Sequence, residues 1–534
     1  MSTVVSVRNL RLALPAGADR EHAVDGVSFD LTAGEILCLV GESGSGKSMC
    51  AHALMGLLPK AVRPVGGEIR FGATDLLGQD AAGWRDTRGR RIGMIFQEPM
   101  TALNPLMRIG DQIAEMYEAH GLLTPAERRA RAVALATEVG LPEPERIVRA
   151  YPHQLSGGQR QRAMIAMALA LEPAVLVADE PTTALDVTTQ AQILGLIRDL
   201  QRRHGMAVLF ITHDFGVVAE IADRVLVLRH GRVVEEGPAP AVLGRPQQAY
   251  TRTLLAAVPS MDPPSRPPVA GAKAVEVAGL SKTYVTGGGW WQKPRRVEAA
   301  RAVAFALHKG ETLGLVGESG SGKSSIAKLV MRLVEPDAGS VRIGDTDLTR
   351  LSGEALRRAR RRIQMVFQDP FASLNPRRSV GRIIADGPRA HGVPEAEATA
   401  RARELLSLVG LDPSAFERFP HEFSGGQRQR IGIARALALE PEILVADEAV
   451  SALDVSVQAQ VLALLEDLKR RLGLSMLFIT HDLRVAAQIC DRIAVMRRGE
   501  IVELKPAAAL FAHPEHPYTR ALLDAVPGRT RSAA

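Results

Sequence analysis

The sequence predicts an α/β protein composed of two tandem copies of one domain, and three observations support this architecture. The octapeptide GESGSGKS occurs at residues 41–48 and again at 317–324. Short apolar runs alternate with segments of helical periodicity, a pattern typical of a parallel sheet covered by helices. The length of 534 residues also exceeds what a single hydrophobic core usually organises.

Further repeats show that each copy is complete to its end. SGGQRQR at 156–162 returns at 424–430, and AYTRTLLAAVP at 249–259 returns as PYTRALLDAVP at 517–527. Each copy therefore carries the same short C-terminal extension as well as the same central motifs.

These repeats predict a first domain over 1–259 and a second over 275–534. The segment 260–274 between them is rich in proline, which favours an extended, semi-rigid linker over a folded element. At about 3.3 Å per residue the linker reaches on the order of 45 Å, enough to let the domains pack face to face.

Within the first copy, the order of apolar runs and turns predicts the elements of the fold. EILCLV is followed by the glycine-rich loop and by KSMCAHALMGLL, which predicts a strand, a loop and a helix. The runs AVLVA (174–178) and AVLFI (207–211) predict strands buried on both faces. The region from about 105 to 165 combines polar and apolar residues at helical spacing and predicts an inserted helical subdomain.

Composition excludes several classes of protein. The fractions of hydrophobic (46%) and charged (23%) residues are typical of a soluble globular protein, and no apolar run approaches the roughly 18 to 20 residues that span a bilayer. The N-terminus lacks the pattern of a secretory signal, so we expect the chain in the cytoplasm. The net charge of +7 is spread over Arg-rich patches such as 357–362, which we interpret as solvated helix faces and not as a nucleic-acid site.

The repeated GESGSGKS loop predicts a phosphate site in each copy. Its glycines let successive backbone N–H groups point at phosphate oxygens, and the following helix adds its positive N-terminal end. Lys47 and Lys323 are expected to reach the β- and γ-phosphates of ATP, and Ser48 and Ser324 to ligate Mg²⁺. The other predicted phosphate-loop residues are Gly41, Ser43, Gly44, Gly46, Gly317, Ser319, Gly320 and Gly322.

Phosphoryl transfer also needs a carboxylate for the metal and a residue that positions the attacking water. LVADE at 176–180 and 444–448 supplies both. Asp179 and Asp447 are predicted metal ligands, and Glu180 and Glu448 are predicted to position water. Adjacent carboxylates alone would indicate only a solvated strand end; here they follow a phosphate loop in both copies.

LSGGQ at 155–159 and FSGGQ at 423–427 resemble the signature motif of the ATPases of ABC transporters. Ser156 precedes an apolar helix, so its segment predicts either a second anion-binding helix N-terminus or an ordinary N-cap worth about 1 kcal/mol, and the two are compatible. The resemblance implies two tandem P-loop ABC nucleotide-binding domains. Each would contain a RecA-like core, a helical subdomain and an antiparallel β region.

The resemblance also implies roles for further residues. Gln97 and Gln368 match the Q-loop, which contacts metal, water and permease; His213 and His481 match the switch histidine.

The family packs its two domains head to tail, so each ATP would lie between the phosphate loop of one and the signature motif of the other. One composite site would pair Lys47, Ser48, Gln97, Asp179, Glu180 and His213 with Ser424, Gly425 and Gly426. The other would pair Lys323, Ser324, Gln368, Asp447, Glu448 and His481 with Ser156, Gly157 and Gly158. We predict that both hydrolyse ATP.

Departures from the family pattern distinguish the two copies. Ala449 stands where the first copy has Pro181, and Thr183 stands where the second has Ser451. Alignment of VRNLRLAL with VAGLSKTY places Leu14 opposite Tyr284, the aromatic residue expected to stack on adenine. We therefore hypothesise that the first site binds nucleotide more weakly.

Local features favour transport over the other functions of twin cassettes. A soluble translation factor would carry a long charged linker, and a DNA-repair ATPase would carry CxxC pairs; the three cysteines here, Cys38, Cys50 and Cys490, have no metal-type spacing. The segments LNPLM, LNPRR and HPEHPYTRALL resemble the peptide and nickel importer subfamily. The inserted loop TGGGWWQKPRR also fits that subfamily, and we expect Trp290 and Trp291 to pack locally.

This resemblance implies an ATPase that powers an importer of di- or oligopeptides from the cytoplasmic face of the inner membrane. The implied partners are two integral-membrane permeases and an extracytoplasmic substrate-binding protein, with no nucleic acid. Nickel, glutathione and peptide-like antibiotics remain alternative substrates.

Overall fold

The computed structural model describes residues 2–183, 185–267, 269, 271–286, 295–451 and 453–528. The chain divides into two compact units, one formed by Met1–Ala257 with Val526–Ala534 and the other by Val258–Ala525. Within the described ranges, no helix is long and apolar enough to cross a bilayer. The predicted packing of Trp290 and Trp291 concerns residues outside these ranges.

A six-stranded sheet forms the centre of the first unit, in the order β10-β9-β3-β8-β7-β6. The strands are β3 (Ile36–Val40), β6 (Ile92–Ile95), β7 (Val175–Asp179), β8 (Ala207–Ile211), β9 (Arg224–Arg229) and β10 (Arg232–Pro238). The first five pair in parallel, whereas β10 runs antiparallel to β9. Every residue of β3, β7 and β8 is buried, which explains their uninterrupted apolar sequences.

An antiparallel sheet of four strands, in the order β2-β1-β4-β5, packs against the same core. Its strands are β1 (Thr3–Ala13), β2 (His22–Thr32), β4 (Arg63–Phe71) and β5 (Thr74–Asp75). Apolar side chains from both sheets and from α1 (Lys47–Leu54) meet there, among them Val7, Leu10, Leu39 and Leu209. The phosphate loop thus lies between β3 and α1, fixed by a core on which both sheets pack.

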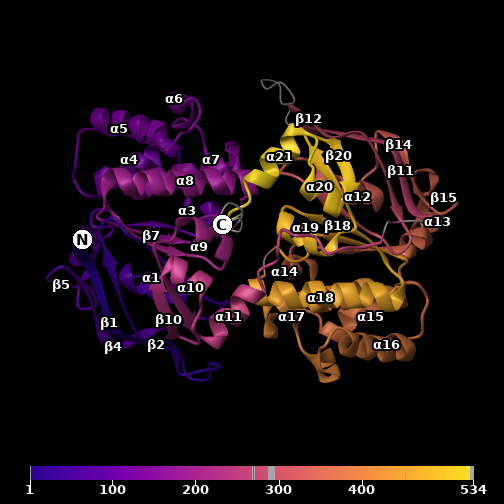
Figure 1. Cartoon of the computed structure of the whole chain (residues 1–534), viewed down its shortest axis with the longest axis horizontal. Coiled ribbons are helices and arrows are strands. Elements are labelled where there is room, and N and C mark those ends of the chain that lie inside the picture. The colour runs from indigo at the N-terminus through magenta and orange to yellow at the C-terminus, as the bar shows by residue number, and fades with distance from the viewer. Residues whose placement is uncertain are drawn as a thin grey trace. The chain divides into compact units, whose positions relative to one another are not determined.

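The predicted helical subdomain is present and follows β6. It contains α3 (Pro99–Ala102), α4 (Ile109–Ala119), α5 (Pro125–Glu138), α6 (Pro144–Ile147), η1 (Pro152–Gln154) and α7 (Gly157–Leu169). Helices α4, α5 and α6 gather at the end of the unit away from β1, β2 and β4 (Figure 1). The other helices are α2 (Ala81–Thr87), α8 (Val187–His204), α9 (Phe215–Ile221), α10 (Ala239–Gly244) and α11 (Ala249–Ala256).

The second unit repeats this architecture. Its central sheet has the order β16-β17-β18-β13-β19-β20, and its antiparallel sheet the order β12-β11-β14-β15. The strands are β11 (Lys273–Thr286), β12 (Arg295–His308), β13 (Thr312–Val316), β14 (Ala338–Ile343), β15 (Thr346–Asp347), β16 (Ile363–Val366), β17 (Ile443–Asp447), β18 (Ser475–Thr480), β19 (Arg492–Arg497) and β20 (Glu500–Pro506).

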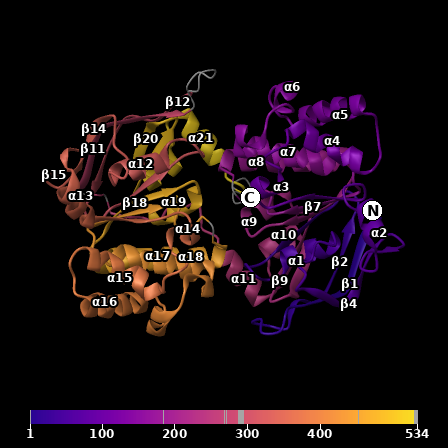
Figure 2. The ribbon, with the colours of Figure 1, turned by 180° about the vertical axis from the view of Figure 1, so that it is seen from behind.

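The helices of the second unit follow the chain order of those of the first, with two additional 3₁₀ turns, η2 and η3, and with a 3₁₀ turn, η4, in place of α6. They are α12 (Lys323–Val330), η2 (Leu348–Arg350), α13 (Gly353–Ala359), η3 (Arg360–Arg362), α14 (Pro370–Ser373), α15 (Val380–Ala390), α16 (Glu395–Leu408), η4 (Pro413–Glu417), η5 (Pro420–Glu422), α17 (Gly425–Leu437), α18 (Val455–Leu472), α19 (Leu483–Ile489), α20 (Ala507–Ala512) and α21 (Pro517–Asp524). Viewed from behind, α15 and α16 again lie away from β11 and β14 (Figure 2).

The proline-rich segment after α11 forms no helix or strand over 259–267, and it is fastened to the second unit. The amide of Gln488 in α19 donates to the carbonyl oxygens of Ser260 (2.9 Å) and Asp262 (3.2 Å). The side chain of Arg266, only 18% exposed, contacts Asp491 at 3.2 Å and donates to Gln488 O at 2.6 Å. We call residues 260–266 the strap.

In the first unit, the backbone carbonyl equivalent to that of Gln488 accepts a hydrogen bond without a strap. There Arg198, in α8, donates to Glu220 O of α9 at 2.6 Å. The equivalent of Arg198 in α18 is Glu466, which instead pairs with Arg266 at 3.1 Å. The strap therefore supplies to the second unit a guanidinium that the first unit carries on its own helix.

Candidate functional site: two phosphate loops and their carboxylates

Each phosphate loop has a backbone that only glycine allows at two points. Gly41 has φ of 149° and Gly46 of 104°, and a Cβ on them would lie 2.3 Å from Leu228 O and 2.6 Å from Ala23 O. In the second loop a Cβ on Gly317 or Gly322 would approach backbone oxygens to 2.2 and 2.1 Å. Substitution at these glycines would therefore displace the loop from the sheet.

Helices α1 and α12 begin at the predicted lysines, whose side chains fold back into the loop. Lys47 Nζ donates to Gly41 O (2.8 Å) and Glu42 O (2.9 Å), and Lys323 Nζ donates to Gly317 O (2.7 Å) and Glu318 O (2.9 Å). Both lysines are buried, with 6% and 5% of the residue exposed. Each ammonium group is thus held by carbonyl oxygens within the loop where phosphate is expected.

In each copy the structure brings together two of the three predicted metal ligands, the serine and the aspartate, while the glutamine, Gln97 or Gln368, contacts the neighbouring glutamate. Ser48 Oγ donates to Asp179 Oδ1 at 3.1 Å, and Ser324 Oγ donates to Asp447 Oδ1 at 3.2 Å. Burial raises the pKa of both aspartates despite the serine hydrogen bond. One hydroxyl and one carboxylate fit Mg²⁺, which takes oxygen ligands and usually completes its shell with phosphate and water.

The predicted water-positioning glutamates follow β7 and β17 in a left-handed backbone conformation, with φ of 46° and 48°. Gln97 Nε2 donates to Glu180 Oε2 at 3.0 Å, and His213 Nδ1 lies 3.2 Å from Glu180 Oε1. In the second unit, Gln368 and His481 approach Glu448 to 2.7 and 3.3 Å. The Q-loop glutamine, the carboxylate and the switch histidine therefore meet in each unit.

Burial and mutual attraction oppose each other in the histidine–glutamate pairs. Burial raises the pKa of Glu180 and of Glu448, but the hydrogen bond and charge of the histidine outweigh it, so both pKa values are lowered. Burial lowers the pKa of His213 and of His481, but the partner glutamate reverses the direction, so both are raised.

These shifts predict a pH dependence of unfolding in the absence of ATP. Because the histidine pKa values are raised in the folded protein, the stability that these histidines contribute is fully present below their pKa in the unfolded chain, about 6.5. That contribution is lost as pH rises through their pKa in the folded protein. The glutamate stabilisation is full above about 4.5 and is lost toward acid. We expect the thermal midpoint to fall as pH rises above about 6.5, and His213→Gln with His481→Gln to flatten that slope.

Thermal unfolding monitored by circular dichroism across pH 5 to about 9 measures this effect. Exposed histidines at equivalent positions, His153 and His421, provide the matched control when both are changed to glutamine. An equal change of slope in the control would show that the pairs at the site are not its source.

The D-loop difference between the copies has a consequence at the carboxylate. Thr183 Oγ1 donates to Glu180 Oε2 at 3.0 Å, whereas Ser451 Oγ donates to the backbone oxygen of Glu448 at 3.0 Å. The Glu180 carboxylate therefore has one more donor than that of Glu448. The sequence shows this substitution but not the change of acceptor.

Both signature serines act as helix N-caps. Ser156 caps α7 in a capping box with Gln159, and Ser424 caps α17 in the same way with Gln427. A Cβ on Gly158 or Gly426 would lie 2.6 or 2.2 Å from a side chain of the following long helix, so glycine also permits close helix packing there. The signature motif predicted to complete each ATP site belongs to the other compact unit.

Strand registers confirm the equivalence of Leu14 and Tyr284. Leu12 pairs with Val24 and Ala13 with His22; the corresponding pairs in the second unit are Lys282 with Ala300 and Thr283 with Glu298. Leu14 follows directly and packs against the core, partly buried. The first site therefore has an aliphatic side chain where the second has a tyrosine ring.

We expect Leu14→Tyr to increase ATP affinity at the first site by about fivefold or more, since aromatic–base stacking contributes on the order of 1–3 kcal/mol. Titration with a fluorescent ATP analogue in a Lys323→Ala background isolates this site. Leu14→Phe should give a similar gain and Leu14→Ile none; equal affinities for all three would refute the hypothesis.

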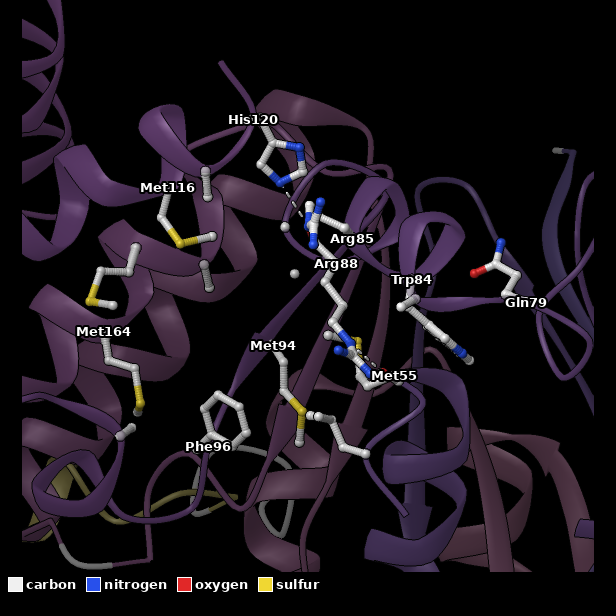
Figure 3. A pocket seen from close by; sticks show the side chains of 18 of the residues that line it. Met55, Gln79, Trp84, Arg85, Arg88, Met94, Phe96, Met116, His120 and Met164 are labelled. Carbon is white, nitrogen blue, oxygen red and sulfur yellow. Dashed lines mark hydrogen bonds between the residues drawn. The ribbon is translucent and has the colours of Figure 1, made fainter. Parts of the chain in front are cut away.

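A groove lies beside each Q-loop, and the two grooves differ in chemistry. The first has a volume of about 860 Å³ and five methionines in its lining, with Trp84 and Phe96. Figure 3 shows Met116 and Met164 on one side and Trp84 on the other, with Met94 and Phe96 between them. The second groove has a volume of about 520 Å³, and Arg378, Asp386 and Arg435 are among the residues that line it. Arg360 in its lining corresponds to Arg88 in the first groove, because both donate to backbone oxygens at the end of the preceding helix.

Two residues near the phosphate loops have no place in the sequence-based prediction. Tyr250 and Tyr518 lie in the repeated C-terminal extensions, and their hydroxyls contact Glu42 and Glu318. The repetition of YTR in both tails is the only signal in the sequence that marks them.

Comparison with known proteins gives matches over nearly the whole chain. Residues 24–183 and 300–451 match the family described as ABC transporter, and residues 234–283 and 502–533 match the oligopeptide/dipeptide transporter C-terminal region. The peptidoglycan transport ATP-binding protein YejF of Agrobacterium fabrum is 49% identical over 98% of this chain and 96% of that protein. The glutathione import ATP-binding protein GsiA of Escherichia coli K12 is 48% identical over 98% of this chain and 89% of that protein. A solved dimeric ATP-binding cassette bound to ADP and phosphate covers 44% of this chain at 30% identity, with a TM-score of 0.40.

Proposed function

Because this chain belongs to the ABC transporter family, as a double ATP-binding cassette of the peptide and nickel importer subfamily, we propose that it powers the import of small peptides. The family hydrolyses ATP. The match of both tails to the oligopeptide/dipeptide C-terminal region carries the choice of substrate class. The names of two relatives, a glutathione import and a peptidoglycan transport ATP-binding protein, agree with a peptide-bearing cargo.

We propose that Mg²⁺ joins the nucleotide at Ser48 and Asp179 in the first unit and at Ser324 and Asp447 in the second. The bound ion would neutralise charge on the phosphates during transfer. Glu180 and Glu448 would then exchange their Gln and His partners for the attacking water, which they orient toward the γ-phosphate. The switch histidines, released from the carboxylates, would be positioned to donate to the γ-phosphate.

Closure of the two cassettes on ATP would shift the population toward a state that the permeases can sense. The grooves beside Phe96 and Phe367 are the proposed binding sites for two permease segments at the cytoplasmic face of the inner membrane. Each phenylalanine directly precedes the Q-loop glutamine that contacts the catalytic carboxylate. A permease segment in the groove would therefore lie one residue from a group that changes partners during hydrolysis.

The chemistry of the grooves favours two different permeases. At the position of Met167 in the first groove, the second has Arg435, whose guanidinium lies 5.3 Å from the Phe367 ring and donates to Ser373 O. Arg435 Nη2 is buried and has no hydrogen-bond partner among the described residues. A buried, unsatisfied donor costs stability, so a permease segment with a carboxylate or a free carbonyl would complete the second groove. Apolar side chains would fill the methionine-lined first groove.

The test is reconstitution of the chain with its two permeases and a binding protein in lipid vesicles. We expect a binding protein loaded with peptide to stimulate ATP hydrolysis, and one loaded with nickel not to do so. Arg435→Met should weaken association with one permease and Met167→Arg with the other, by about tenfold or more, since charge mismatch in a buried interface is costly. Arg435→Lys and Met167→Leu are the matched controls. Association with ribosomes and not with permeases would overturn the proposal.

A further inference from the structure

Each C-terminal extension places one tyrosine hydroxyl on the same residue of its phosphate loop. The backbone N–H of Glu42 donates to Tyr250 Oη at 3.4 Å, and Tyr250 Oη donates to Glu42 Oε2 at 3.2 Å. In the second unit the N–H of Glu318 donates to Tyr518 Oη at 3.2 Å. The two units show the same contact independently, although about 200 residues of chain separate its partners.

An arginine side chain lies over the ring of each of these tyrosines. Arg229 lies over the Tyr250 ring at 4.7 Å, and Arg497 lies over the Tyr518 ring at 4.8 Å. The turn that precedes each tail helix is fixed by a carboxylate, because the backbone N–H groups of Gln247 and Gln248 both donate to Glu235. The turn before the tail helix and the tyrosine ring are therefore both held in place, and the tyrosine hydroxyl contacts the phosphate loop.

The second unit repeats this docking with its own residues. The N–H groups of Glu515 and His516 donate to Glu503 at 2.9 and 3.0 Å. Tyr518 is only 8% exposed. Burial raises the pKa of both tyrosines to about 12, so the hydroxyls stay protonated and able to donate throughout the neutral range.

The residue that the tyrosine holds is also the one that the phosphate-binding lysine contacts. Glu42 O accepts a hydrogen bond from Lys47 Nζ at 2.9 Å, and Glu318 O accepts one from Lys323 Nζ at 2.9 Å. The tyrosine thus contacts the N–H and the carboxylate of this one residue, and the lysine contacts its carbonyl oxygen. Displacement of its peptide plane would move the acceptor that sets the position of the ammonium group.

We propose that Tyr250 and Tyr518 are positioning residues for ATP binding, which act through Glu42 and Glu318 on the phosphate-loop lysines. They do not contact nucleotide themselves. The C-terminal extension thereby becomes part of the nucleotide site, and its docking sets the affinity of the loop for ATP.

The decisive variant is Tyr250→Phe with Tyr518→Phe, because phenylalanine keeps the ring and its contact with arginine and removes only the hydroxyl. We expect the KM for ATP to rise between about threefold and tenfold, the range that the net loss of one hydrogen bond spans, while kcat stays within about twofold. Tyr117→Phe, which removes a buried hydroxyl in α4, is the control and should leave KM unchanged.

A second set of variants approaches the loop from the glutamate side. Glu42→Ala with Glu318→Ala should also raise the KM for ATP. In that background, adding Tyr250→Phe and Tyr518→Phe should raise KM much less than the same two substitutions do in the parent protein. Glu42→Gln with Glu318→Gln should raise KM less than the alanine pair does, because the amide oxygen can still accept from the tyrosine. Multiplicative effects of the two sets would show that they act separately.

Thermal unfolding of ATP-free protein distinguishes positioning from simple anchoring of the tail. Positioning predicts that KM changes while the thermal midpoint does not. An unchanged KM in the phenylalanine variant, or a KM that rises only together with loss of the thermal midpoint, would overturn the proposal. Loss of ATP hydrolysis in the parent chain would instead contradict the proposed function, so the two failures are distinguishable.

Discussion

Replacement of both Glu180 and Glu448 by glutamine is expected to lower ATP turnover at least about a hundredfold, while ATP binding remains. Glutamine keeps the size of the side chain and its hydrogen bond to the Q-loop, but it is neutral and cannot hold the attacking water as an anion does. The cassettes should therefore accumulate in the closed, ATP-loaded state. Phosphate release measures the first effect, and retention of labelled ATP on rapid gel filtration measures the second.

The chain contains a matched control for this substitution. Glu172 and Glu440 occupy equivalent positions, and both have φ of 52°, close to the values of Glu180 and Glu448. They lie on the surface, with side chains 62% and 63% exposed. Glu172→Gln with Glu440→Gln should leave turnover unchanged. Rapid hydrolysis in the Glu180→Gln, Glu448→Gln variant would contradict the role proposed for these carboxylates.

The second large effect comes from pairing substitutions across the two units. If the sites are composite, Lys47→Ala with Ser424→Arg damages one site twice and leaves the other intact. Lys47→Ala with Ser156→Arg damages both sites once. We expect the first pair to retain about one ATP per chain in the closed state and the second to retain almost none, since each site needs both its lysine and the opposite signature motif.

Equilibrium binding of labelled ATP in the Glu180→Gln, Glu448→Gln background gives these stoichiometries directly. The mirror pairs, Lys323→Ala with Ser156→Arg and Lys323→Ala with Ser424→Arg, should behave in the same two ways. Equal binding by both kinds of pair would show that each unit holds ATP without the other's signature motif. Thermal midpoints of the four variants control for loss of folding.

The parts of the site that the sequence predicts are those built from local patterns. GESGSGKS, LVADE and ITHD each lie at the end of a buried strand, so motif and strand together place Lys47, Asp179 and His213 at one edge of the sheet. The apolar runs of the strands and the helical periodicity of the inserted subdomain are likewise short-range signals, and the structure contains both elements.

The features that the sequence does not predict depend on contacts between distant segments. Tyr250 meets Glu42 only because α11 docks beside the phosphate loop, and no periodicity or motif encodes that approach. The different acceptors of Thr183 and Ser451 depend on side-chain torsions within a turn. The groove residue Arg435 reads in the sequence as one of many arginines, and its buried Nη2 becomes apparent only in the fold.

The strap changes what the connection between the cassettes does mechanically. Its first hydrogen-bonded residue, Ser260, follows the C-cap of α11, Ala257, by three positions, which is about 10 Å of chain at full extension. The predicted reach of about 45 Å is available only to a linker released from α19. A rotation of the first cassette would therefore act on Gln488 and Arg266 almost at once. The connection would transmit force to the second cassette and would not serve as a slack, flexible tether.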